Sequence, residues 1–257
     1  MDLQLTDKVA IITGASRGIG RSIAQRLASE GMKLILAARS QDQLESLASS
    51  LPTECLLQTL DLRAAAAPQR LIGAAVKRFG QLDLLVNNAG ATRRGDFLSL
   101  SDDDWADGYA LKFFGAMRCC RTAWPHLQNS RGSIVNIIGI GGRTGSAEFT
   151  IGGSVNAALM NLTKCLADRG VADGVRVNAI NPGSIGTERL QTRINSFAAE
   201  NGLDKATAGQ IMAKKMGISR FGEPDEIASV VAFLASSQSA YIHGSILDVD
   251  GGQTRTL

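Results

Sequence analysis

The order of apolar and polar positions along the chain predicts alternating strands and helices. Short β-branched runs recur between longer amphipathic stretches, a pattern typical of repeated βα units and a mostly parallel sheet. The predicted strands are nearly continuous in apolar residues, as expected when helices cover both faces of the sheet. They span 9–13, 34–38, 55–60, 82–87, 133–138, 175–180 and 245–249. The predicted helices span 18–30, 41–50, 64–79, 102–128, 151–170 and 224–236.

The whole chain, 1–257, is expected to form one domain with a doubly wound Rossmann-type α/β fold, because no repeat, linker or shift in composition divides it. Residues 187–220 are helix-like but have no neighbouring strand. They follow the sixth strand, at the end where open α/β sheets place their ligands. This segment is either a substrate lid or a helix pair that only packs.

Composition excludes several classes of function. Apolar residues make up 44% of the chain and charged residues 20%, and no apolar run is long enough to cross a bilayer. We therefore expect a soluble, cytoplasmic protein without a membrane partner. The net charge of +3 comes from scattered Lys and Arg, which argues against nucleic acid. The four cysteines have no CxxC spacing and the histidines do not cluster, so no metal site is expected.

A glycine-rich turn follows the first strand, with the sequence TGASRGIG at 13–20, and leads into a helix. Glycines let the backbone approach a pyrophosphate, and the N–H groups and dipole of the helix then face its charge. The alternative is a tight turn without a ligand. The position between strand and helix favours a dinucleotide site.

The end of the second strand predicts which dinucleotide binds. An acidic residue there would bind the ribose hydroxyl of NAD, whereas this chain has Ala38 followed by Arg39. A guanidinium suits a phosphate, and Arg17 in the glycine turn is a second candidate for that contact. NADP(H) is therefore predicted in preference to NAD.

Five motifs together resemble the short-chain dehydrogenase/reductase family: TGASRGIG at 13–20, LDL at 60–62, NNAG at 87–90, NAINPG at 178–183 and DGG at 250–252. The resemblance implies a seven-stranded sheet, a small-molecule carbonyl or alcohol substrate, and a homodimer or homotetramer. Together with the glycine turn and the end of the second strand, it implies one set of cofactor-binding residues. These are Gly14, Ser16, Arg17, Gly18, Ile19, Gly20, Arg39, Asp61, Leu62, Asn87, Ala89, Gly90, Pro182, Gly183, Ile185 and Thr187.

The chain departs from this family at its four catalytic positions. The family has Asn, Ser and a Tyr-x-x-x-Lys pair, where Tyr moves the substrate proton and Lys lowers its pKa. Neighbouring residues align the Asn position with Lys112 and the Ser position with Gly139, and they align the Tyr-Lys pair with Gly152 and Asn156. The resemblance thus implies that all four are substituted. Loss of positioned acid–base catalysis slows a reaction by about 10²–10⁴.

Lys112 is the leading candidate for a replacement. An ammonium there would polarise a carbonyl or, with a pKa lowered by burial, donate a proton. The alternative is that Lys112 only fills the space and charge of the lost Lys, binding ribose or water. Tyr109, one helical turn earlier, is a weaker candidate and is otherwise a core residue. Glu148, Thr150 and Ser154 flank the position of the family's Tyr but are more typical of caps.

Three functions follow from these features. The first is an NADP(H)-dependent oxidoreductase with a non-standard proton donor. The second is a lyase or isomerase on the same scaffold, and the third is a cofactor-binding protein without catalysis. In the segment 187–220, Arg189 and Arg193 are available for a carboxylate or phosphate. Four apolar residues there either face substrate or, as is more usual at helical spacing, only pack: Phe197, Ile211, Met212 and Met216.

Overall fold

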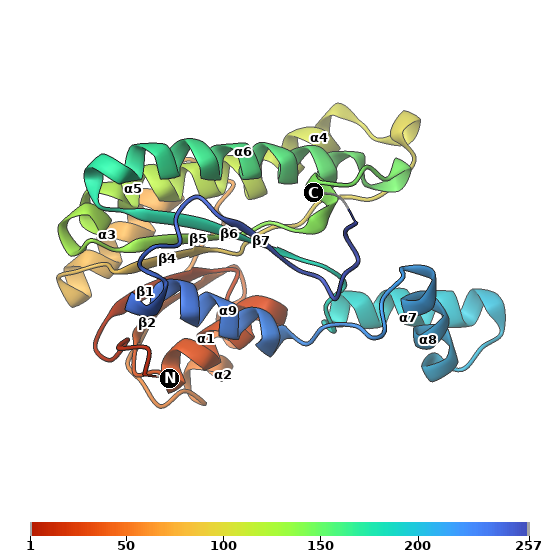
Figure 1. Cartoon of the computed structure of the whole chain (residues 1–257), viewed down its shortest axis with the longest axis horizontal. Helices are drawn as coiled ribbons and strands as arrows, with labels where there is room; N and C mark the ends of the chain where they lie inside the picture. The colour runs from red at the N-terminus through yellow and green to blue at the C-terminus, as the bar shows by residue number, and fades with distance from the viewer. Residues whose placement is uncertain (1, 256–257) are drawn as a thin grey trace.

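Seven strands form one sheet in the computed structural model, which describes residues 2–255. The strand order is β3-β2-β1-β4-β5-β6-β7, and every neighbouring pair is parallel. The doubly wound prediction is therefore confirmed (Figure 1). The strands are β1 Val9–Thr13, β2 Lys33–Ala38, β3 Cys55–Thr59, β4 Leu84–Asn87, β5 Ser133–Ile137, β6 Arg176–Pro182 and β7 Ile246–Val249.

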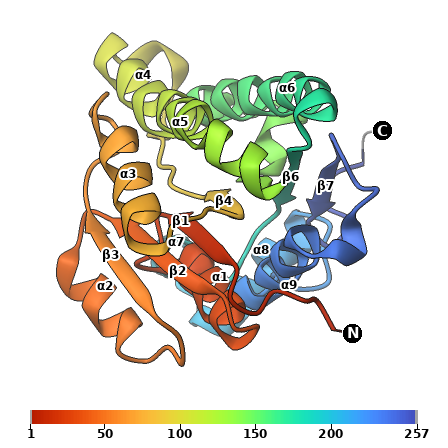
Figure 2. The ribbon, with the colours of Figure 1, turned by 90° about the vertical axis from the view of Figure 1, so that its left-hand side faces the viewer.

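Helices cover both faces of the sheet. In Figures 1 and 2, α1, α2 and α9 lie on one face, and α3, α4, α5 and α6 lie on the other. The bounds on the first face are α1 Gly18–Ser29, α2 Gln41–Ala48 and α9 Pro224–Ala235. On the second they are α3 Ala67–Phe79, α4 Asp102–Gly108, α5 Gly115–Ser130 and α6 Thr150–Asp173.

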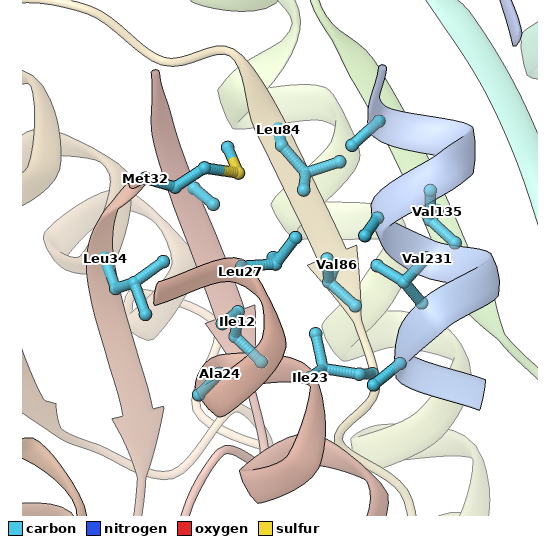
Figure 3. Packing of buried hydrophobic residues seen from close by; sticks show 14 of the residues in the cluster. Ile12, Ile23, Ala24, Leu27, Met32, Leu34, Leu84, Val86, Val135 and Val231 are labelled. Atoms are coloured by element: carbon cyan, nitrogen blue, oxygen red, sulfur yellow. The ribbon is translucent and has the colours of Figure 1, made fainter. Parts of the chain in front are cut away.

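The core between the sheet and α1 positions the first strand and its turn. Ile12 of β1 and Val86 of β4 pack with Ile23 and Leu27 of α1, and Val231 of α9 completes the layer (Figure 3). All five side chains are fully buried. Burial of such a side chain contributes roughly 1.5–3 kcal/mol, so the strand and helix on either side of the glycine turn are held firmly.

The prediction of one continuous helix over 102–128 is wrong in one respect. A π-helical turn, Tyr109–Phe114, separates α4 from α5. Gly108 and Gly115 flank it, and each brings the backbone against a neighbouring side chain, Ile151 and Leu62 respectively. A π turn of this kind lies within an otherwise continuous helical stretch, so the sequence shows no helix-ending signal at this point. The turn carries Lys112.

Residues 187–220 form a helix pair beyond the carboxyl ends of the strands (Figure 1). These helices are α7 Glu188–Asn201 and α8 Lys205–Lys215. Met212 is buried between them, and Phe197 and Met216 pack against the same cluster. Of the two expectations for these three residues, packing within the helix pair is the one that these contacts support. Within residues 2–255, no helix is long and apolar enough to span a bilayer.

Candidate active site

The glycine turn adopts a conformation that only glycine takes easily. Gly14 and Gly18 have φ values of +66° and +55°. A Cβ on Gly20 would overlap the carbonyl oxygen of Gly14, so the first turn of α1 lies directly against the end of β1. Arg17 at the helix N-cap makes no side-chain capping bond. The free N–H groups of this helix end therefore form a cradle that suits a phosphate group.

A hydrogen-bond network that the sequence did not reveal locks this turn to β4. The Thr13 hydroxyl donates to the Val86 carbonyl at 3.2 Å and accepts the N–H groups of Asn88 and Ala89, each at 3.0 Å. The Asn88 amide donates to the carbonyls of Thr13 and Gly14 at 3.0 and 3.1 Å. Only their position in the glycine turn and the NNAG motif singled out these residues. The network fixes the shape of the cradle.

The end of β6 approaches the same turn. A Cβ placed on Gly18 would lie 3.3 Å from the Thr187 methyl group, so these two predicted cofactor residues are neighbours. Pro182 and Ile185 are buried below them. Gly183 passes so close to Asp250 that a Cβ would come 2.7 Å from its Cα. The structure thus brings the predicted groups at 14–20 and 182–187 together.

The end of β2 and the glycine turn before α1 carry the two predicted phosphate-binding arginines, Arg39 and Arg17. Arg39 is exposed. The pKa of Asp107 is lowered mainly by a hydrogen bond from Arg63, and the positive charge of Arg39 lowers it further. The Asp61 carboxylate accepts a hydrogen bond from the backbone N–H of the same Arg63 at 3.0 Å. Arg17 is also exposed and lies 3.9 Å from Glu188 of α7. The two arginines therefore flank the groove from different elements.

The predicted residues after β3 and β4 have mixed positions. Leu62 is buried against Gly115, and Asn87 directs its amide to Asn136 on β5 at 2.9 Å. These two side chains support the floor of the groove from within. Ala89 and Gly90 lie at its surface: Ala89 touches Gly14, and the aliphatic stem of Lys112 packs on Gly90.

Lys112 and Asn156 meet at the centre of the site. The Lys112 ammonium donates to Asn156 Oδ1 at 2.5 Å and to the Ile138 carbonyl at 2.6 Å. Asn156 is buried and donates its own amide to the Gly139 carbonyl at 3.2 Å. The structure therefore joins three of the predicted catalytic positions, 112, 139 and 156, in one network.

The environment of Lys112 opposes its positive charge. Burial of the ammonium, followed by the nearby charge of Arg189, lowers the pKa of Lys112 to about 7. Two oxygen acceptors hold the nitrogen in place, and an amine with this pKa exchanges protons readily near neutral pH. The site thus contains a positioned group suited to acid–base chemistry.

The fourth position, Gly152, is covered by an aromatic ring. A Cβ on Gly152 would overlap the ring of Phe149, and a Cβ on Gly141 would come 2.8 Å from the same ring. Phe149 therefore occupies the space into which a side chain at 152 would project. The sequence pattern gave no indication of this, because Phe149 lies three residues earlier in a loop.

The remaining candidates have local structural contacts. Tyr109 packs its ring against Phe113 at 6.1 Å between centroids, and within residues 2–255 its hydroxyl makes no hydrogen bond. Ser154 donates to the Ile151 carbonyl, and the Glu148 carbonyl accepts from Gly95. The Thr150 hydroxyl is buried without a partner among the described residues.

Comparison with known proteins places this site in a family. Residues 14–254 match the family model described as Enoyl-(Acyl carrier protein) reductase. The chain is 31% identical over 256 residues to the meso-2,3-butanediol dehydrogenase of Serratia marcescens, covering 98% of this chain and 96% of that protein. It is 37% identical over 262 residues to the 1,6-dihydroxycyclohexa-2,4-diene-1-carboxylate dehydrogenase of Pseudomonas putida, with 98% and 94% covered.

Solved structures agree with these relatives. The L-sorbose reductase of Gluconobacter frateurii, complexed with NADPH and L-sorbose, superposes with a TM-score of 0.95 at 33% identity and covers 100% of both chains. A short-chain dehydrogenase/reductase from Serratia marcescens has a TM-score of 0.87 at 34% identity, with 97% and 98% covered. The chain therefore belongs to the short-chain dehydrogenase/reductase family of oxidoreductases.

Proposed function

We propose that this protein is an NADP(H)-dependent oxidoreductase that interconverts a carbonyl and an alcohol with Lys112 in the proton-handling role. The pairing of the Lys112 ammonium with Asn156 and the Ile138 carbonyl carries this proposal. The NADPH complex of the similar L-sorbose reductase supports the cofactor assignment.

The cofactor groove fits a phosphorylated dinucleotide. The cradle at 14–20 offers N–H groups to a pyrophosphate, and Arg39 and Arg17 flank the end of β2 with positive charge. NADP(H), when bound, supplies or accepts the hydride. Arg39→Ala is expected to weaken NADPH binding by about tenfold or more while changing NADH binding little. Equal losses for both cofactors, measured by fluorescence titration, would contradict NADP(H) preference.

We propose further that the catalytic residues of the family are replaced at all four positions. By resemblance the family places Asn at 112 and Lys at 156, and this chain has the reverse, Lys112 and Asn156. Their direct hydrogen bond means that an ammonium and an amide still meet there. Since neither Gly152 nor Gly139 provides a hydroxyl, we assign the proton-donating role to the Lys112 ammonium.

In the direction of reduction, the Lys112 ammonium donates a proton to the substrate oxygen while hydride reaches the carbonyl carbon. The neutral amine that remains is reprotonated from solvent. Asn156 and the Ile138 carbonyl accept two N–H groups of Lys112, which leaves the third N–H for the substrate oxygen. In the direction of oxidation, the neutral amine accepts the hydroxyl proton.

Lys112→Met tests the proton role, with Lys164→Met on the exposed surface of α6 as the matched control. Turnover of a carbonyl panel with NADPH is expected to fall by about 10²–10⁴ in the first variant and to stay unchanged in the second. The pH profile of kcat should lose its inflection near the pKa of about 7. A rise in KM for NADPH at unchanged kcat would instead assign Lys112 to ribose binding.

Two other outcomes identify the alternative functions. Turnover that leaves the redox state of the nicotinamide unchanged would favour a lyase or isomerase. Tight NADPH binding with no turnover of any substrate would favour a cofactor-binding protein without catalysis, a role with which the Phe149 ring over Gly152 is compatible.

We also propose that α7 and α8, within 187–220, act as a substrate lid on a single domain. The contact of Thr187 with Gly18, and the 3.4 Å hydrogen bond from Arg189 to the Gly90 carbonyl, support this by joining the start of α7 to the groove. Reduced proteolysis of this segment when NADPH is added would support a lid. A homodimer or homotetramer in the cytoplasm is the assembly we expect, and sedimentation measures it.

A further inference from the structure

Three arginines gather beside the Lys112 site without acidic partners. Arg94 lies in the loop after β4, and Arg189 and Arg193 lie in α7. All three are exposed, and no ion pair among the described residues includes any of them. The neighbouring Arg93, by contrast, is paired with Asp104 at 2.9 Å.

Contacts place two of these guanidinium groups around the site. Arg189 donates to the Gly90 carbonyl at 3.4 Å, and Gly90 is the residue on which the Lys112 stem packs. Arg94 stacks on the Phe149 ring, with its guanidinium carbon 4.1 Å from the centroid. Because Phe149 covers Gly152, Arg94 lies near that position, whereas Arg189 lies near Lys112.

Arg193 joins this pair along α7. It follows Arg189 by four residues, so the two side chains project from the same face of the helix. Arg94 is exposed as a residue, but partial burial of its guanidinium, followed by the charges of Arg193 and Arg189, lowers its pKa, while the charge of Glu148 acts in the opposite direction. Like charges held near one another repel, and a bound anion would relieve that repulsion.

We propose that Arg94, Arg189 and Arg193 bind a carboxylate of the substrate, so that the enzyme acts on carbonyl or hydroxy compounds that bear a negative charge. The geometry of a guanidinium matches a carboxylate, and two of these arginines come from the proposed lid. The inference rests on the proposed function for the identity of the site. Phosphates of the cofactor are the other source of an anion.

Benzoate and benzamide are suitable probes, because they have nearly the same shape and differ in charge. Each is titrated by calorimetry into the full chain saturated with NADPH, so that the cofactor's own phosphates are already in place. Benzoate is expected to bind about tenfold more tightly than benzamide, and added salt should reduce this preference.

Arg94→Met and Arg193→Met should each abolish most of the preference, since Met keeps an apolar stem and removes the charge. Arg93→Met is the matched control, because Arg93 is the neighbouring residue and pairs with Asp104. It should keep the full preference.

Several results would overturn the proposal. Equal binding of the two probes, no binding of benzoate, or equal losses in Arg93→Met and Arg94→Met would each do so. Benzoate binding that is seen only without NADPH would assign the arginines to the cofactor's phosphates. These measurements need no turnover, so a charge preference in a protein without redox activity would refute the proposed function and leave only the carboxylate-binding role of the arginines standing.

Discussion

The Lys112 ammonium and the Asn156 amide are hydrogen-bonded at 2.5 Å, although 44 residues separate them along the chain. The π-helical turn carries the first and α6 carries the second. An ammonium that is held by an amide in a partly buried site has both a fixed position and a lowered pKa. This pair is the basis of two predictions.

Exchanging the two residues should preserve activity better than changing either one. Lys112→Asn removes the ammonium and is expected to lower kcat/KM by about 10²–10⁴. Asn156→Lys places a second cation beside the first. The double variant again has one ammonium and one amide, so its activity should exceed that of Lys112→Asn by at least about tenfold. If the effects of the two single substitutions on kcat/KM simply add in the double variant, Lys112 and Asn156 do not act as a pair.

Stability should depend on pH through Lys112. Its pKa falls from an ordinary 10.5 to about 7 on folding. Between these values the unfolded chain binds a proton that the folded chain lacks, so stability rises with pH over that interval and levels off below it. The free energy of unfolding, relative to Lys112→Met, should rise by up to about 1.4 kcal/mol per pH unit. Urea unfolding of both proteins at pH 7 to 10 measures this difference in the free energy of unfolding. A difference that stays constant over this range would show that the pKa of Lys112 is not lowered.

Gly152→Ala should destabilise the protein, because its Cβ would overlap the Phe149 ring. The expected loss is about 1–3 kcal/mol in the free energy of unfolding. Gly73 in α3 is the matched control: nothing lies within 4 Å of a Cβ there. Gly73→Ala should stabilise by about 1 kcal/mol, as is usual in a helix. Adding Phe149→Ala to Gly152→Ala should recover part of the loss, and full additivity would show that the ring is not the obstacle.

Thr13→Val should loosen the phosphate cradle. The Thr13 hydroxyl accepts hydrogen bonds from the N–H groups of Asn88 and Ala89. Val has the same shape but no hydroxyl, so both N–H groups lose their acceptor. We expect a loss of about 1–3 kcal/mol in stability and weaker NADPH binding. Thr13→Ser keeps the hydroxyl and should bind NADPH nearly normally. If Val and Ser variants bind NADPH equally well, the network has no part in shaping the turn.

The strand and helix order was predictable from the sequence because its causes are local. Apolar runs identified all seven strands, and glycines at 14 and 18 marked a turn that needs positive φ. The parallel arrangement followed, since each pair of strands is separated by a helix. The resemblance also assigned four candidate catalytic positions by counting from neighbouring motifs, and their substitution stays a prediction.

Only the tertiary structure decided what those positions do together. The helix over 102–128 was predicted as continuous, because a π turn inside a helical stretch carries no helix-ending signal in the sequence. Its presence allows Lys112 to meet Asn156 and the Ile138 carbonyl, and burial then lowers the pKa. Likewise Phe149 fills the space over Gly152, and Arg94 lies on its ring. These contacts join residues from separate βα units. Periodicity in the chain reports which face of an element is buried, whereas the partner across the site depends on how the elements pack.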